Sequence, residues 1–301
     1  MELPHLPGRQ KDRQRTEGSG DVEAADRFGQ GISRLEWLEM RSTRVYTRLA
    51  GAILAGVCAA SPATAWTPTT QVIIAREAAR LSPPDLARQI EKHQRAFEDG
   101  VAAPFGDTDS GRHMKNPDGS GLLDRAAGEA MRAAVEAIRA HKPFEEIVRR
   151  LGVVSHYVAD ANNPLAASGD DPEERRYFVD YLRYAESAEP RFPLVFYGLQ
   201  PGLDRARDLS PLLDAALKRG RELYPAVGGE YRRIDFASGI ESFDDRSTAF
   251  AVASVSFSHA VTDVTLALRY IWLAAGGIDD RANLPAGGTR LTLLPRAGRA
   301  R

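Results

Sequence analysis

Apolar residues recur at helical spacing along most of this chain after residue 66, and this pattern constrains its fold more than any other feature. It predicts helices over residues 70–81, 83–98, 122–141, 144–161, 172–188, 211–224 and about 247–275. An alternating strand pattern is missing, and 193–197 is the one ambiguous stretch. The sequence therefore predicts a single all-α domain, a helical bundle that occupies residues 66–301.

The segment before this domain has the pattern of a secretory signal peptide. A basic stretch at 40–48 precedes an apolar stretch at 49–60, and Ala63-Thr-Ala65 matches a signal-peptidase site. The apolar stretch is shorter than the roughly 20 residues of a membrane span. We therefore expect a signal peptide over 40–65, a mature protein without a transmembrane segment that begins at Trp66, and export to the periplasm or the medium. Residues 1–39 are polar without an apolar period, which predicts a disordered extension or a mis-assigned start.

Composition excludes several classes of site and partner. Cys58 is the only cysteine and would leave with the signal peptide, so the mature protein has no thiol for a disulfide or a thiolate zinc site. The chain has 40 Lys and Arg against 41 Asp and Glu, for a net charge of −1. Stable binding to nucleic acid is not expected without a broad basic field. The oligomeric state is left open.

Two motifs carry candidate chemistry. His156 and Asp160 are four residues apart on a predicted helix and share one face, where both could reach one zinc ion at about 2.0–2.2 Å. Alone, such a pair is more often a surface hydrogen bond. His113 lies in the long connection 100–121, and loops of this length in compact domains commonly carry function. His259 and Asp263 repeat the spacing, but within an apolar helix, which favours a core histidine.

The order of these features resembles the zinc-dependent phospholipase C family and the related fungal single-strand nucleases. The resemblance consists of Trp66 after the signal, the loop His113, and the motif Leu151-Gly-x-x-x-His156-Tyr-x-x-Asp160-x-x-x-Pro164. It spans most of the mature chain, including the closing helix. It implies an all-helical domain that holds three zinc ions at the bottom of a cleft and cleaves phosphodiester bonds.

Carried over residue by residue, the resemblance implies that Trp66, His113, His156 and Asp160 are zinc ligands. Other ligand positions depart from the family pattern. Gln71 replaces a histidine, and Phe105 replaces an aspartate for which Asp107 is the candidate substitute. The remaining departures are Ala166, Pro172 and Arg176. One of the three zinc sites should therefore be lost and the terminal-amine site weakened, whereas the resemblance retains a site made by His113, His156 and Asp160, with Asp107 as a catalytic carboxylate.

The resemblance thus implies an exported, zinc-dependent phosphodiester hydrolase that acts on phospholipid head groups with a reduced metal centre. The alternative is a catalytically degenerate relative that kept the fold as a binding protein, because loss of neighbouring ions weakens stabilisation of the phosphoryl charge. An unrelated helical bundle with chance motifs is a third hypothesis, less favoured because four positions match in order.

Overall fold

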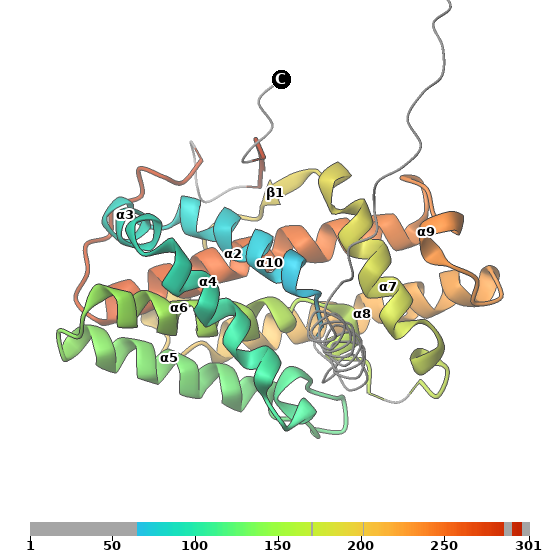
Figure 1. The fold of residues 1–301 in the computed structure, drawn as a ribbon, viewed down its shortest axis with the longest axis horizontal. Coiled ribbons are helices and arrows are strands. Elements are labelled where there is room, and N and C mark those ends of the chain that lie inside the picture. The colour runs from blue at the N-terminus through green and yellow to red at the C-terminus, as the bar shows by residue number, and fades with distance from the viewer. Residues whose placement is uncertain (1–64, 170, 201, 286–290, 297–301) are drawn as a thin grey trace, which may run out of the picture. The chain divides into compact units, whose positions relative to one another are not determined.

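The computed structural model describes residues 65–301 except 170, 201, 286–290 and 297–301. Expectations for residues 1–39 and for the signal peptide up to residue 64 lie outside these described residues. The described part is mostly helical, which confirms the all-α prediction. Its α-helices (Figure 1) are α2 Pro68–Leu81, α3 Pro84–Lys92, α4 Gln94–Ala102, α5 Leu123–Arg139, α6 Phe144–Asp160, α7 Glu174–Ala188, α8 Ser210–Arg233, α9 Gly239–Ser242 and α10 Thr248–Ala274.

Two helix predictions need correction. The segment predicted as one helix over 83–98 forms α3 and α4, separated at His93, whose backbone (φ −116°, ψ 34°) leaves the helical region. The helix predicted over 211–224 extends to Arg233 and includes Pro225. Pro225 removes one backbone hydrogen bond from the helix. The helix nevertheless continues past it, and Val227, Gly228 and Tyr231 beyond the proline are buried.

Helix α10 lies at the centre of the core. It contacts α2, α6, α8 and the strand β1 Leu194–Phe196, and it runs behind α2 in Figure 1. Among the described helices, α10 is long and apolar enough to cross a membrane by length and composition alone, but 83% of its most apolar window is buried inside the protein. Its apolar surface is therefore accounted for by core packing.

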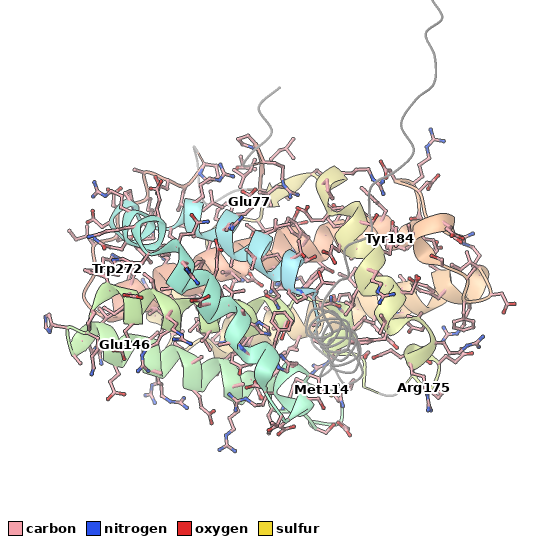
Figure 2. The ribbon with its side chains drawn as sticks, in the orientation of Figure 1. Glu77, Met114, Glu146, Arg175, Tyr184 and Trp272 are labelled. Carbon is pink, nitrogen blue, oxygen red and sulfur yellow. The ribbon has the colours of Figure 1, made fainter. Side chains whose placement is uncertain are left out.

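The ambiguous stretch at 193–197 contains strand β1, which pairs antiparallel with β2 Thr292–Leu294 near the end of the chain. Leu194 pairs with Leu294 and Phe196 with Thr292. Just beyond β2, Arg296 forms ion pairs with Glu189 and with Glu77 of α2, which is labelled in Figure 2. Both glutamates are almost fully buried, so this C-terminal segment supplies positive charge to two buried acids.

Helices α4 and α6 approach each other very closely at two glycines. A Cβ at Gly152 of α6 would lie 2.1 Å from the carbonyl oxygen of Phe97, and one at Gly100 of α4 would lie 2.0 Å from that of Arg149. Only glycine permits such backbone contact. The consequence is that the backbone at the end of α4 faces the side of α6 that carries His156.

Candidate metal centre

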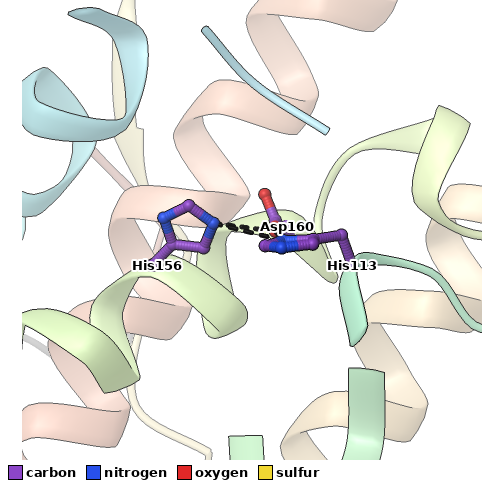
Figure 3. A group of neighbouring side chains, drawn as sticks. All are labelled: His113, His156 and Asp160. Atoms are coloured by element: carbon purple, nitrogen blue, oxygen red, sulfur yellow. Dashed lines mark hydrogen bonds and ion pairs between the residues drawn. The ribbon is translucent and has the colours of Figure 1, made fainter. Parts of the chain in front are cut away.

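Three buried side chains from two distant segments converge beside α6. His156 and Asp160 lie on the last turns of α6, and His113 ends the 3₁₀ turn Ser110–His113 in the long connection (Figure 3). One ligand atom from each of the three lies within 4.8 Å of the others, so the group could hold a metal ion. This confirms the expectation that the loop histidine meets the helical pair.

The distances between the three inward-facing atoms match those around a small metal ion. His113 Nδ1 is 2.8 Å from Asp160 Oδ2 and 3.3 Å from His156 Nε2, while His156 Nε2 is 3.2 Å from Asp160 Oδ2. Ligands bonded at about 2.0 Å to a tetrahedral zinc are roughly 3.3 Å apart. The triangle of atoms is therefore close to one face of a tetrahedral coordination sphere.

The outward-facing nitrogens of both histidines bind backbone carbonyls. His156 Nδ1 lies 2.8 Å from the Val101 oxygen, and His113 Nε2 lies 3.1 Å from the Pro104 oxygen. Because a carbonyl only accepts, each outward nitrogen carries the proton and donates it. Neutral rings then direct two lone pairs at a carboxylate oxygen, an arrangement that requires a cation between them. Carbonyl partners of this kind fix the tautomer of metal-binding histidines.

Without a metal, a proton would serve as this cation. Burial by itself would lower the pKa of His113, but the hydrogen bond and charge of Asp160 outweigh it and hold the pKa of His113 above 6.5. Burial would raise the pKa of Asp160, but the charge of His156 and the hydrogen bond from His113 hold it below 3.8. A metal ion at this position must therefore displace a proton.

Gln71 of α2 forms a hydrogen bond with the second oxygen of the Asp160 carboxylate. Its Nε2 donates to Asp160 Oδ1 at 2.6 Å and lies 3.5 Å from the His156 carbonyl oxygen. Its other amide atom, Oε1, is buried and has no hydrogen-bond partner within the part of the chain that the structure describes. A buried acceptor without a donor lowers the stability of the fold, because its desolvation is not compensated. This acceptor lies on a side chain that already contacts the carboxylate of the candidate centre.

Asp107 lies behind His113 instead of joining the three inward-facing atoms. Its Oδ2 is 3.6 Å from His113 Nε2, accepts a hydrogen bond from Tyr157 at 2.6 Å, and pairs with Arg112 at 3.0 Å. The Asp107 and Arg112 side chains are partly exposed. Burial, followed by the Asp107 hydrogen bond, raises the pKa of Tyr157 to about 12, so its hydroxyl stays protonated and donates. The catalytic role assigned to Asp107 stays a prediction.

Trp66 packs its side chain beside the centre. It is 1% exposed, and its indole nitrogen donates to the Ala159 carbonyl oxygen at 2.9 Å, one residue before Asp160. The next residue, Thr67, caps the N-terminus of α2, the helix that carries Gln71. These contacts give Trp66 a packing role. Its expected role as a ligand through a free amine stays a prediction.

The positions where other family ligands would lie have ordinary structural surroundings. Ala166 is buried, and Phe105 packs edge-on against His156 with ring centroids 4.8 Å apart. Arg176 is exposed, pairs with Glu173 at 3.3 Å and stacks over Phe236 at 3.5 Å. Arg176 is therefore a surface arginine on α7.

The second histidine–aspartate pair does not converge on a shared ligand. His259 stacks on Tyr197 with ring centroids 3.6 Å apart, and burial lowers the pKa of His259 to about 4. Asp263 instead pairs with Arg219. The pair therefore has a structural role in α10, as its apolar sequence context indicated.

The three candidate ligands are almost completely removed from solvent, since His113 is 1% exposed and His156 and Asp160 are 0% exposed. Sequence reasoning identified all three and named Gln71 and Asp107, which contact them, but it missed the backbone carbonyl groups that bind the two histidines. The carbonyl groups of Val101 and Pro104 carry no side-chain signal. Gly152 was visible in the motif, and a glycine inside an amphipathic helix is a signal of close packing.

Comparisons with known proteins leave the centre without an assigned family. A scan against protein-family models gives no match, and a search of curated proteins gives no significant match.

Proposed function

We propose that this chain is a zinc-binding protein of the phospholipase C type in which His113, His156 and Asp160 hold one ion. The observation that carries the proposal is the triangle of inward-facing atoms, 2.8–3.3 Å on a side. Two imidazoles and a carboxylate form a donor set that suits zinc, and the mature sequence has no thiolate to recruit a softer metal. The order of the matched motif residues supports the fold type.

The burial of the ligands favours the non-catalytic alternative over hydrolysis. Structural zinc sites are closed, whereas catalytic sites keep an open position. A bound ion would join α6 to the loop that carries His113. Gln71 Oε1, which is buried and has no partner among the described residues, is the candidate for a further ligand atom.

Phosphodiester hydrolysis, on a phospholipid head group or another phosphodiester, is the second candidate. The group formed by the partly exposed Asp107 and Arg112 with the buried Tyr157 favours it, because this group lies directly behind His113. A guanidinium can bind phosphate oxygens, and a carboxylate can accept a proton. When bound, zinc would lower the pKa of a coordinated water towards about 7.

Metal content tests the site. We expect about one zinc per chain in purified protein that begins at Trp66. His156→Ala should lose this zinc, whereas His93→Ala, at the junction of α3 and α4, should retain it. Protein without zinc after incubation in zinc-containing buffer would overturn the proposal. Three zinc ions per chain would show that the lost ligand positions were assigned wrongly.

Hydrolysis of bis(4-nitrophenyl) phosphate separates the two candidates. The non-catalytic proposal expects no turnover by the zinc-loaded protein above that of His156→Ala. Turnover that is lost in both His156→Ala and Asp107→Asn would instead establish the hydrolase.

Two further measurements address the N-terminus. We propose that the chain is exported and cleaved after Ala65, and mass spectrometry of the native N-terminus should find Trp66 first. If the Trp66 amine is a ligand, one added alanine should weaken zinc binding, because the amide nitrogen that replaces the amine has no available lone pair. Equal affinity in both forms would leave Trp66 with its packing role alone.

A further inference from the structure

We infer that a cavity far along α5 from the metal centre is a binding site for a small organic anion with an apolar group. The cavity has a volume of about 490 Å³ and lies among the second half of α5, the end of α10 and the segment before α8. This volume is within the range of small-molecule sites. None of the three candidate metal ligands lines it.

Three arginines line this cavity, which we call the arginine cavity: Arg132 and Arg139 from α5, and Arg207 from the segment before α8. Glu136 is the single acidic residue among its lining residues. Within the described residues, none of the three arginines has a carboxylate partner within 4.0 Å, whereas Arg269, Arg232 and other arginines do.

One of the three arginines is partly engaged by the backbone. Arg139 Nη2 donates to the Ala274 carbonyl oxygen at 2.7 Å, at the end of α10. A guanidinium has five N–H donors, so Arg139 keeps others for a ligand. Arg132 and Arg207 form no hydrogen bond to another described residue and are exposed, so an anion can reach them without rearrangement of the core.

The backbone next to Arg207 is hydrogen-bonded to α10. The Tyr270 hydroxyl of α10 donates to the carbonyl oxygen of Ala206 at 3.0 Å, which anchors the backbone beside Arg207. The neighbouring Asp208 uses its carboxylate to accept the backbone N–H of Ser210 at 2.9 Å. Arg207 is thus held at the cavity by a core helix. The hydrogen bonds from Ser210, together with the charge of Arg132, lower the pKa of Asp208, so this acid offsets part of the positive charge at the cavity.

Charge and shape together define the ligand class. Three guanidinium groups line this cavity against the one acid Glu136, and a bound anion would form charge-assisted hydrogen bonds with them. The rest of the lining is largely apolar: Met131, Val135, Ala140, Tyr270 and Ala274. A phosphate or carboxylate head on a short alkyl or aryl group satisfies both parts of the lining.

Calorimetric titration with octyl phosphate tests the inference. The full mature protein is used in EDTA, and also as His156→Ala, so that binding at the metal centre does not contribute. We expect one site, affinity that falls with added salt, and weaker binding of both octanol and inorganic phosphate. The double variant Arg132→Gln/Arg207→Gln should bind octyl phosphate with an affinity lower by about tenfold or more, because charge-assisted hydrogen bonds are lost.

The matched control is Arg149→Gln/Arg183→Gln, which removes the same charge from two exposed arginines outside the cavity. Unchanged affinity in this control supports the site, provided that both double variants keep the unfolding temperature of the parent. Equal affinity of parent and Arg132→Gln/Arg207→Gln would overturn the inference. So would equal binding of octanol and octyl phosphate, since the arginines would then contribute nothing.

Discussion

Replacing Gly152 by alanine tests whether the close contact of α4 and α6 builds the candidate metal centre. The new Cβ would lie 2.1 Å from the Phe97 oxygen and 2.8 Å from the Val101 nitrogen, whereas ordinary Cβ contacts are 3.4–4 Å. These are backbone atoms, so the helices must separate by about 1 Å in a close-packed interior. The bond from His156 Nδ1 to Val101, now 2.8 Å, would then exceed the roughly 3.5 Å limit of a hydrogen bond.

The expected effect has two parts. Overpacking costs about 1–3 kcal/mol, and the better helix propensity of alanine returns about 0.5–1 kcal/mol. A net loss of about 1–2 kcal/mol lowers the unfolding temperature of a domain of this size by roughly 2–8 °C. Loss of a hydrogen bond that orients a metal-binding histidine lowers metal affinity by about 10–100-fold.

Thermal unfolding in EDTA measures the first part, and zinc titration against a chelating dye measures the second. Gly229→Ala is the matched control: it lies on α8, and no neighbouring atom lies within 4 Å of its added Cβ. We expect it to leave zinc affinity unchanged and stability equal or slightly higher. A Gly152→Ala protein with the parent's unfolding temperature and zinc affinity would refute the argument.

Three other predictions follow from charges in the structure. Arg296→Met should lower stability by about 3–5 kcal/mol, because it leaves Glu189 buried without this partner, although Glu77 keeps Arg80 at 2.7 Å. Arg281→Met at an exposed pair should have little effect, and equal unfolding temperatures of the two variants would contradict this. The raised pKa of His113 stabilises the metal-free fold below pH 6.5, and this contribution is lost as pH rises through the folded pKa, so unfolding temperature in EDTA should fall with pH there. Zinc should oppose this fall because it replaces the proton, and parallel curves with and without zinc would contradict the shared site. Gln71→His should strengthen zinc binding, measured with the same dye, since imidazole is a better ligand than an amide; weaker binding would show that the Gln71 hydrogen bond to Asp160 matters more.

The local parts of the fold could be predicted from sequence because their signals are local. Helical periodicity depends on residues three and four apart, so α2, α6 and α10 were expected close to their observed bounds. The same spacing placed His156 and Asp160 on one face of a helix. Helix ends carry weaker signals, and the break at His93 and the extension of α8 beyond residue 224 were therefore missed.

Tertiary structure alone decided what surrounds those residues. Strands β1 and β2 are far apart in sequence, and their backbone pairing has little side-chain signature. The Val101 and Pro104 carbonyls that hold the two histidines are backbone groups, which every residue has, so no residue type marks them. Sequence alone determined that a histidine, a second histidine and an aspartate were available. Whether their three inward atoms lie close enough for one ion depends on how closely α4 and α6 pack, which only the folded chain decides.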